Sequence, residues 1–279
     1  MNFFNPKNLK ELHSIADKID GKYYYLAGGT DINVQIKHEM IGKDDNIIYI
    51  NELSELKGII EEEDEIILGS LTTFTQLLKS ELMQKYFPIL AENLQNFASP
   101  LLQTTATIGG NIANGSPTAD IIPLLLVLDA KLILSGANGE RTVMLNGFYT
   151  GYKKNFLAKG EIIKSIVINK NALNGANTFY KKVGARKTLT IAKVSLAAIW
   201  EMENSKIKRI CLAAGSLNEY ARRLPLVEQY LLNKKKTEVD LKKLEEILKQ
   251  EVTPISDLRS DREYRFQVCL NLIKEIIEI

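Results

Sequence analysis

The N-terminal part of the chain alternates between helical and strand-like hydrophobic patterns. Apolar residues at helical spacing predict a helix from about 7 to 19. Short aromatic and apolar runs at 23–26 and 46–50 predict two strands, and the segment 32–36 between them predicts a helix. Together these elements predict a small βαβ-like unit that ends near residue 55.

The middle part of the chain changes to a pattern of hairpins and helices. Acidic residues separate two apolar runs and predict a hairpin, and Thr72 or Thr73 is a candidate N-cap. The apolar run that follows Asp120 predicts a buried helix with this carboxylate in its first turn. The expected elements are a hairpin over 58–68, helices up to 78, over 86–97 and over 121–128, and strands over 131–134, 141–145 and 161–168.

The C-terminal part begins after the best candidate linker, 169–177, in which five of nine residues are Asn or Gly. Beyond it the pattern predicts a meander of long strands followed by helices that back the sheet. The expected strands are 179–183, 191–202 and 207–214, and the expected helices are 224–232, 239–248 and 257–277. The fold class is therefore α+β, with one domain over 1–170, split near residue 55, and a second over 176–279.

Length and charge narrow the possible functions. A chain of 279 residues exceeds the usual size of one domain, which agrees with two domains. Its net charge of +2 produces no field that would attract nucleic acid or a membrane surface. The N-terminus lacks the pattern of a secretion signal, and the longest apolar run, 121–128, is too short to cross a bilayer. We expect a cytoplasmic protein.

The few cysteines and histidines limit the chemistry that the chain can perform alone. Cys211 and Cys269 are far apart in the sequence and form no CxxC motif, which argues against a disulfide framework or a cysteine metal site. His13 and His38 are too few for a histidine-rich metal site and make a catalytic triad improbable. Redox or group-transfer chemistry would need a bound organic cofactor.

A first glycine segment, Ala27-Gly28-Gly29-Thr30-Asp31, lies where a predicted strand is followed by a helix. Backbone amides at such a place favour an anion, and Thr30 or Asp31 could cap the helix. The GxGxxG fingerprint and the GxxxxGK[ST] phosphate loop are both missing. Taken alone, the segment is more typical of a simple tight turn than of a phosphate site.

A second segment, 106–120, combines small residues, hydrogen-bonding side chains and one carboxylate. We interpret it as an irregular loop that forms a backbone cradle, because long loops inside a compact domain are usually functional. An ordinary surface loop is the alternative. Two separate segments able to bind phosphate would suit a ligand with two phosphates, such as a dinucleotide.

Four motifs in this order resemble the FAD-binding subunit of molybdenum hydroxylases, the flavoprotein component of the xanthine dehydrogenase and carbon monoxide dehydrogenase type. They are AGGTD, ATIGGNIANGSPTAD, YKKVGARKTLTIAKVSLAA and PISDLRSDREYR, and they extend over essentially the whole chain. The resemblance implies an FAD-binding fold of the vanillyl-alcohol oxidase and p-cresol methylhydroxylase type. FAD would lie between two N-terminal subdomains, and an additional C-terminal α+β domain would pack on them.

The resemblance also implies which residues contact the cofactor. The first pyrophosphate-binding turn would consist of Ala27, Gly28, Gly29, Thr30, Asp31 and Ile32, and the second of Thr107, Gly109, Gly110 and Asn111. The remaining contacts would be Phe97 and Ala98 beside the flavin, Ser116 and Pro117 in the loop, Asp120 at the adenosine portion, Ile163 near the flavin, and Lys182.

Several of these residues have ordinary structural alternatives. Phe97 and Ile163 are equally typical of a hydrophobic core. Lys182 could belong to a solvated strand edge, and Asp120 could be a carboxylate stabilised at a helix start. Two departures from the family pattern stand out: Gln103-Thr104 replaces a common Arg-Asn pair, and Asp261 replaces a usual serine in the last motif. A cysteine-rich insertion typical of one branch is absent.

The function that the resemblance implies is electron transfer by bound FAD. Electrons would arrive from 2Fe-2S clusters of a separate iron–sulfur subunit, fed by a molybdopterin-binding large subunit, and would leave to NAD or another acceptor. The chain itself would supply no catalytic residue and no metal ligand. The alternatives are a self-contained flavin oxidoreductase of the same fold and a cofactor-free assembly module.

Overall fold

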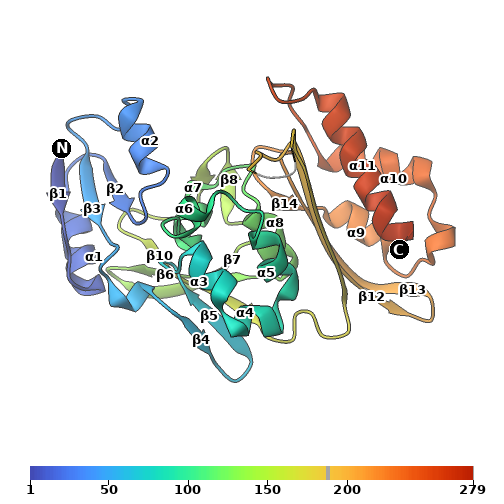
Figure 1. Ribbon diagram of the computed structural model, residues 1–279, viewed down its shortest axis with the longest axis horizontal. Helices are drawn as coiled ribbons and strands as arrows, with labels where there is room; N and C mark the ends of the chain where they lie inside the picture. Colours follow the sequence, from blue (N-terminus) through green and yellow to red (C-terminus); the bar gives the residue numbers. More distant parts are fainter. Residues whose placement is uncertain (187–188, 279) are drawn as a thin grey trace.

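The computed structural model describes residues 1–186 and 189–278 and has an elongated shape with three parts in a row (Figure 1). The N-terminal unit and the C-terminal helices lie at opposite ends, with a mixed unit between them. The α+β class is confirmed. Lys187 and Thr188, which belong to the third motif, and Ile279 lie outside the described residues.

The N-terminal unit contains a three-stranded parallel sheet in the order β1-β3-β2. The predicted βαβ-like unit is confirmed, and β1 is an additional strand whose short, exposed sequence carries no alternation. Leu12 and Ala16 of the first helix pack with Ile48 of the central strand, which buries the apolar side of that helix. The elements are β1 (Asn2–Phe4), α1 (Leu9–Lys18), β2 (Tyr23–Leu26), α2 (Ile32–Lys37), β3 (Asn46–Tyr49) and the 3-10 turn η1 (Ser54–Leu56).

The middle unit is built on a five-stranded antiparallel sheet in the order β4-β5-β10-β6-β7. The predicted hairpin over 58–68 is confirmed, and the predicted strands 131–134 and 141–145 pair with each other as a second hairpin. The last strand of the unit inserts between the two hairpins. The strands are β4 (Ile59–Glu61), β5 (Glu65–Gly69), β6 (Lys131–Gly136), β7 (Gly139–Met144) and β10 (Ile162–Asn169). A separate small hairpin consists of β8 (Tyr149–Gly151) and β9 (Lys154–Asn155).

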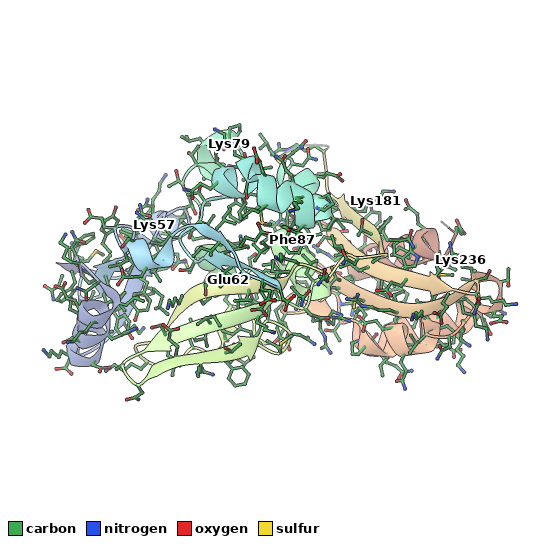
Figure 2. The ribbon with its side chains drawn as sticks, turned by 90° about the horizontal axis from the view of Figure 1, so that it is seen from below. Lys57, Glu62, Lys79, Phe87, Lys181 and Lys236 are labelled. Atoms are coloured by element: carbon green, nitrogen blue, oxygen red, sulfur yellow. The ribbon has the colours of Figure 1, made fainter. Side chains whose placement is uncertain are left out.

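Six short helices cover this sheet. They are α3 (Phe74–Lys79), α4 (Glu81–Tyr86), α5 (Pro88–Leu94), α6 (Pro100–Gln103), α7 (Ile108–Asn114) and α8 (Ile121–Val127). Thr73 caps the first of them in a capping box with Gln76, as expected of one of the two threonines. Figure 2 shows Phe87 inside this unit, whereas Lys57 and Lys79 lie at its surface.

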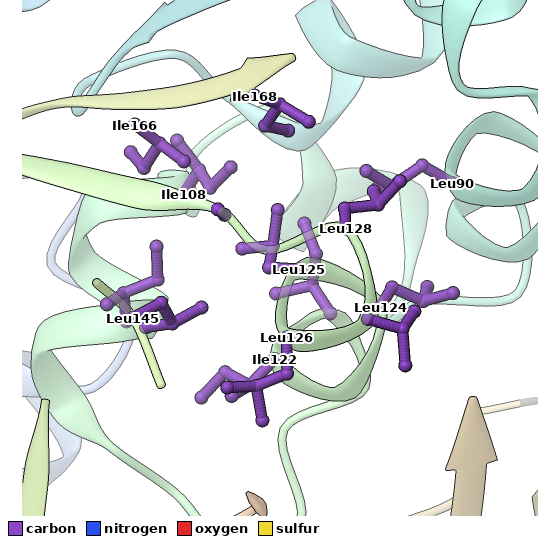
Figure 3. Packing of buried hydrophobic residues seen from close by; sticks show 14 of the residues in the cluster. Leu90, Ile108, Ile122, Leu124, Leu125, Leu126, Leu128, Leu145, Ile166 and Ile168 are labelled. Atoms are coloured by element: carbon purple, nitrogen blue, oxygen red, sulfur yellow. The ribbon is translucent and has the colours of Figure 1, made fainter. Parts of the chain in front are cut away.

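Helix α8 is buried on every side, as its continuous apolar sequence predicts. Figure 3 shows Leu124, Leu125 and Leu126 projecting from it in different directions. Pro123 is tolerated because it lies in the first turn, where its missing N–H has no intrahelical partner. This helix forms the centre of the molecule, since it packs on the middle unit and on β12 and β13 of the C-terminal sheet.

The expectation of an irregular loop over 106–120 is wrong, because helix α7 lies inside it. The hydroxyl of Thr107 accepts the Gly110 N–H at 3.2 Å and so caps the helix, and Gly115 ends it with a left-handed φ of 58°. Two glycines lower helix propensity, but Ile108 and Ile112 are fully buried on one side. Burial of that side outweighs the propensity.

The C-terminal unit is an antiparallel meander with helices on one face and α8 on the other. Alternate residues of β12 therefore join two different cores, and the strand is continuously apolar from Leu196 to Trp200. The last helix begins later than predicted, because Asp257 and Ser260 close a turn before it. The elements are β11 (Asn177–Val183), β12 (Val194–Glu203), β13 (Lys206–Gly215), β14 (Arg222–Arg223), α9 (Pro225–Leu231), η2 (Lys236–Glu238), α10 (Leu241–Glu251) and α11 (Arg262–Glu278).

Within the described ranges, no helix combines the length and the hydropathy needed to span a bilayer.

Cys211 and Cys269 are both buried and unpaired, and burial raises the pKa of Cys269 to about 12. His13 is buried too, and its ring nitrogens lie 3.2 Å from the Gly160 carbonyl and 3.0 Å from the Ser135 hydroxyl. His13 and Cys211 thus lie where two units pack together, whereas Cys269 belongs to the core of the C-terminal unit.

Candidate functional site

A cleft of about 730 Å³ lies between the N-terminal unit and helices α6 and α7 of the middle unit. This volume is typical of sites for organic ligands. Eleven of the predicted site residues line it: Ala27, Gly28, Gly29, Thr30, Asp31, Ile32, Phe97, Ala98, Thr107, Gly110 and Asn111. The two motifs that the resemblance assigns to the cofactor therefore meet at one cleft, although about eighty residues separate them in the sequence.

The first glycine segment forms a turn whose backbone amides have no partner in the protein. Within the described chain, the N–H groups of residues 28–32 donate no hydrogen bond, and the first donor after them is Asn33, bonded to Gly29 O at 3.0 Å. Asp31 occupies the N-cap position of α2 but makes no side-chain capping bond, so the expected cap is wrong. Unpaired amides at a helix start are well suited to an anionic group.

The two walls of the cleft touch at the base of this turn. A β-carbon added to Gly28 would overlap the carbonyl oxygen of Thr105, so only glycine permits the contact. A second contact joins the walls through side chains, because Asn114 Nδ2 donates to Asp31 Oδ1 at 3.2 Å. Backbone of one unit thus closes directly on backbone of the other and leaves the free amides facing the cleft.

The second glycine segment contributes to the cleft differently from the first. Its helix-start amides are already used, because Ile108 N–H donates to Thr72 O at 3.0 Å and Gly109 N–H donates to Ser70 O at 2.8 Å. A β-carbon on Gly109 would overlap the side chain of Ser70, so this glycine packs against the sheet rather than the ligand. The expectation of a second amide cradle is therefore not met, and Gly110 and Asn111 line the cleft from the side of α7.

Two residues that line the cleft each have a buried side-chain oxygen with no hydrogen-bond partner among the described residues. They are Asn111, through its amide oxygen, and Tyr25, whose hydroxyl lies toward Tyr23 and Asp17 and has its pKa raised mainly by burial. Such groups cost stability unless a ligand or water bonds them. Phe97 adds an apolar surface and is held against Phe74, with ring centroids 4.0 Å apart. Free amides, unsatisfied polar atoms and an aromatic wall together fit a dinucleotide with a planar ring system.

Six predicted site residues do not line the cleft: Gly109, Ser116, Pro117, Asp120, Ile163 and Lys182. Ile163 is buried in the main core, as its structural alternative predicted. Asp120 precedes α8 and pairs with Lys182 of β11 at 2.6 Å, with both side chains mostly buried. Burial raises the pKa of Asp120 and outweighs the opposing effect of Lys182. The other carboxylate oxygen of Asp120 is buried and has no hydrogen-bond partner among the described residues.

Several cleft residues escaped the sequence interpretation. They are Tyr23, Tyr24, Tyr25, Gln35, Leu102, Ala106, Ala113, Asn114, Lys153, Asn155 and Leu157. Gln35 could have been found from its helical spacing to Ile32, which places both on one side of α2. Lys153, Asn155 and Leu157 reach the cleft because the β8–β9 hairpin folds against α7, where Asn155 Nδ2 donates to Ala113 O at 3.0 Å. No local pattern in the sequence indicates that contact.

The described side chains contain no group of three or more His, Cys, Asp or Glu that could hold a metal ion. The cleft itself carries amides, hydroxyls, one carboxylate and one ammonium group. Its chemistry is therefore the binding and orientation of a ligand, with apolar walls that limit the access of water.

Two family models match the chain and together extend over most of it. Residues 1–170 match the FAD binding domain in molybdopterin dehydrogenase, and residues 179–278 match the CO dehydrogenase flavoprotein C-terminal domain.

Individual relatives are similar over nearly their whole length. The chain is 31% identical over 267 residues to the xanthine dehydrogenase FAD-binding subunit of Escherichia coli O157:H7, which is 95% of this chain and 90% of that protein. It is 28% identical over 272 residues to the carbon monoxide dehydrogenase medium chain of Hydrogenophaga pseudoflava, 98% and 94% of the two chains. The solved structure of carbon monoxide dehydrogenase from the same organism superimposes with a TM-score of 0.91, over 99% of this chain and 95% of that chain.

Proposed function

Because this chain belongs to the family of FAD-binding subunits of molybdenum hydroxylases, which are oxidoreductases, we propose that FAD binds in the cleft between the N-terminal unit and α7. When bound, FAD would supply the redox chemistry, taking electrons from 2Fe-2S clusters of a partner subunit and passing them to NAD or another acceptor. A large subunit with molybdopterin would complete the complex in the cytoplasm. The proposed domains are 1–170 and 176–279.

The observation that carries the proposal is the set of unpaired amides at residues 28–32. They would hold the diphosphate, since five N–H donors on one turn can replace the water molecules that hydrate an anion. The turn needs no positively charged side chain for this. Gly28 is essential to this arrangement because it lets the turn close on Thr105. The side-chain oxygen of Asn111 would accept from the ligand the hydrogen bond that it lacks among the described residues.

The walls of the cleft would orient the ligand and limit the access of water. Phe97 is fixed by its contact with Phe74 and by Gln103, whose amide group donates to the Phe97 carbonyl at 2.6 Å. The residue that replaces an arginine of many relatives thus supports the aromatic wall instead of supplying charge. Leu102 and Leu157 extend the apolar surface.

Ser116, Asp120, Ile163 and Lys182 belong to the proposal through the resemblance alone. The ion pair between Asp120 and Lys182 joins α8 to β11, so a cofactor that reached it would contact the C-terminal unit as well. No step of the chemistry requires an acid or base from this chain. Its part is to bind, orient and shield the ligand.

The experiment that tests this function is titration of the purified full chain with FAD, followed by flavin absorbance and quenching of flavin fluorescence. We expect a yellow one-to-one complex that survives gel filtration. Co-expression with an iron–sulfur subunit and a molybdopterin subunit should yield a ternary complex whose flavin bleaches when reducing substrate is added. A colourless chain under all reconstitution conditions would overturn the proposal and favour an assembly module.

A further inference from the structure

The charges that line the cleft are few and nearly cancel. Among the described residues of its wall, Asp31 is the only anion and Lys153 the only cation. A dinucleotide diphosphate brings two negative charges, and Asp31 lies on the same turn as the free amides. The amides offset part of this charge through their dipoles, but a repulsive carboxylate remains beside them. A cation beside the turn would offset the negative charges of Asp31 and the diphosphate.

Lys153 lies at the end of α7 that touches the amide turn. A β-carbon on Gly115, the residue that ends α7, would stand 3.7 Å from Lys153 Cα. The preceding residue, Asn114, donates to Asp31 across the cleft at 3.2 Å. Asn155 anchors the same hairpin to Ala113 O at 3.0 Å. The C-terminal end of α7 therefore contacts the Lys153 backbone through Gly115 and the amide turn through Asn114.

The backbone at Lys153 is left-handed, with φ of 52°. Glycine or asparagine would adopt this conformation more easily, and Lys153 holds it at the turn of the β8–β9 hairpin, where the hairpin reaches the cleft. The lysine is exposed and makes no ion pair with a described carboxylate; its ammonium group lies 6.0 Å from the centroid of the Tyr152 ring. A lysine held in an unfavourable conformation without an internal ion pair has its charge available for a ligand.

We infer that Lys153 is the cation that contacts the diphosphate of the dinucleotide in this cleft and offsets the charge of Asp31. This assignment rests on the proposed function. It makes Lys153 a binding residue that determines affinity for a phosphorylated flavin, and it replaces the arginine that Gln103-Thr104 does not supply. An ordinary structural role is the competing explanation, because a cation also stabilises the carboxyl end of a helix such as α7.

The test compares FAD dissociation constants of the full chain and four variants by fluorescence titration. Lys153→Asn removes the charge but suits the left-handed backbone, and Lys153→Arg keeps the charge. Lys154→Asn is the matched control, since Lys154 is exposed on the same hairpin but does not line the cleft. Asp31→Asn removes the opposing carboxylate. Each titration is repeated at about 0.1 M and about 1 M ionic strength, where the Debye length falls from about 10 Å to about 3 Å.

We expect Lys153→Asn to bind FAD about tenfold more weakly, as for the loss of one charge-assisted hydrogen bond, with the difference shrinking at high salt. Lys153→Arg and Lys154→Asn should remain within about twofold of the parent chain, and Asp31→Asn should bind as tightly or more tightly. Binding of riboflavin, which has no phosphate, should not change in Lys153→Asn.

Two results would overturn the assignment while leaving the proposed function intact. One is equal FAD binding by Lys153→Asn and the parent chain. The other is a loss for Lys153→Asn that is independent of salt and matched by an equal loss for riboflavin, which would indicate a structural role. Failure of the parent chain to bind FAD at all would overturn both proposals.

Discussion

The Cα of Gly28 lies so close to the carbonyl oxygen of Thr105 that a β-carbon at this position would overlap it. This contact joins two segments that are far apart in the sequence, and it forms the base of the cleft. Its effect is to bring the unpaired amides of residues 28–32 against α7. The distance between the walls is therefore set by backbone rather than by adaptable side chains.

Gly28→Ala should consequently impair both folding stability and FAD binding. The added methyl group must push the turn away from Thr105, and overpacking of this kind costs about 1–3 kcal/mol. Thermal unfolding and FAD titration of the same preparation measure the two effects. Gly42→Ala is the matched control, because a β-carbon there would meet only the Asp45 carboxylate at 3.7 Å. Unchanged flavin affinity in Gly28→Ala would contradict the importance of this contact.

Asn111→Ala should separate stability from binding. The side-chain oxygen of Asn111 is buried without a partner, so its removal without ligand should leave the unfolding temperature unchanged or raise it. In contrast, FAD affinity should fall about tenfold, since a hydrogen bond to the ligand is lost. Calorimetric unfolding with and without FAD tests both statements.

The control for Asn111 is Asn93→Ala on α5, outside the cleft. Its Nδ2 donates to the Ile89 carbonyl at 2.6 Å, so its loss should lower the unfolding temperature and leave FAD affinity unchanged. If Asn111→Ala instead destabilises the chain without FAD and binds FAD normally, the oxygen serves the fold and not the ligand.

Much of the fold followed from local patterns, because the strongest signals were also the most buried. The apolar run of α8 and the turn at 136–139 each specify one structure by themselves. Elements whose stability comes from contacts with residues distant in the sequence were harder to predict. Helix α7 contains two glycines and forms because Ile108 and Ile112 are buried and Thr107 caps it. A single sequence window does not contain that information.

The site was predictable to the extent that its residues are neighbours in sequence. The turn at 27–32 was found from its glycines, whereas Lys153 and Asn155 reach the cleft only through the docking of a hairpin on Gly115 and Ala113. Gly109 is a residue of a recognisable motif that does not reach the cleft. Its motif suggested contact with a phosphate, but its amide bonds Ser70 and its missing side chain lets the helix approach the sheet.

Arg223→Met should loosen the contact between the C-terminal unit and α8. The guanidinium group pairs with Glu228 at 2.6 Å and Asp129 at 2.8 Å, and it also donates to the Leu126 carbonyl at the end of α8. Removal leaves the mostly buried carboxylate of Glu228 without a cation, while the Leu212 N–H still donates to it. Breaking a fully buried pair costs about 3–5 kcal/mol, and the partial exposure of Glu228 places this loss at about the lower limit. Urea unfolding measures the loss.

The double variant Arg223→Met with Glu228→Gln should recover part of this stability, because the buried charge is then removed with its partner. Lys208→Met, which breaks the exposed pair with Glu203, should leave the unfolding midpoint unchanged. A double variant that is no more stable than the single one would show that the loss comes from packing rather than charge.

Asp120 should give the chain a pH dependence opposite to that of an ordinary salt-bridged carboxylate. Burial raises its pKa in the folded chain, against the effect of Lys182, so between the ordinary value near 3.9 and the raised value the folded state holds more protons than the unfolded state. The contribution of Asp120 to the free energy of unfolding is therefore fully present below the ordinary pKa and is lost as pH rises through the raised value.

Asp120→Asn is neutral at every pH, so the free energy of unfolding of the parent chain minus that of the variant should fall from about pH 3 to neutral. Asp129→Asn, at the other end of α8, is the control for general effects of charge removal. If Lys182 instead dominated over burial, the pKa of Asp120 would be lowered and the difference would rise with pH. The sign of this slope therefore shows which effect on the pKa of Asp120 is larger, the burial of its carboxylate or its attraction to Lys182.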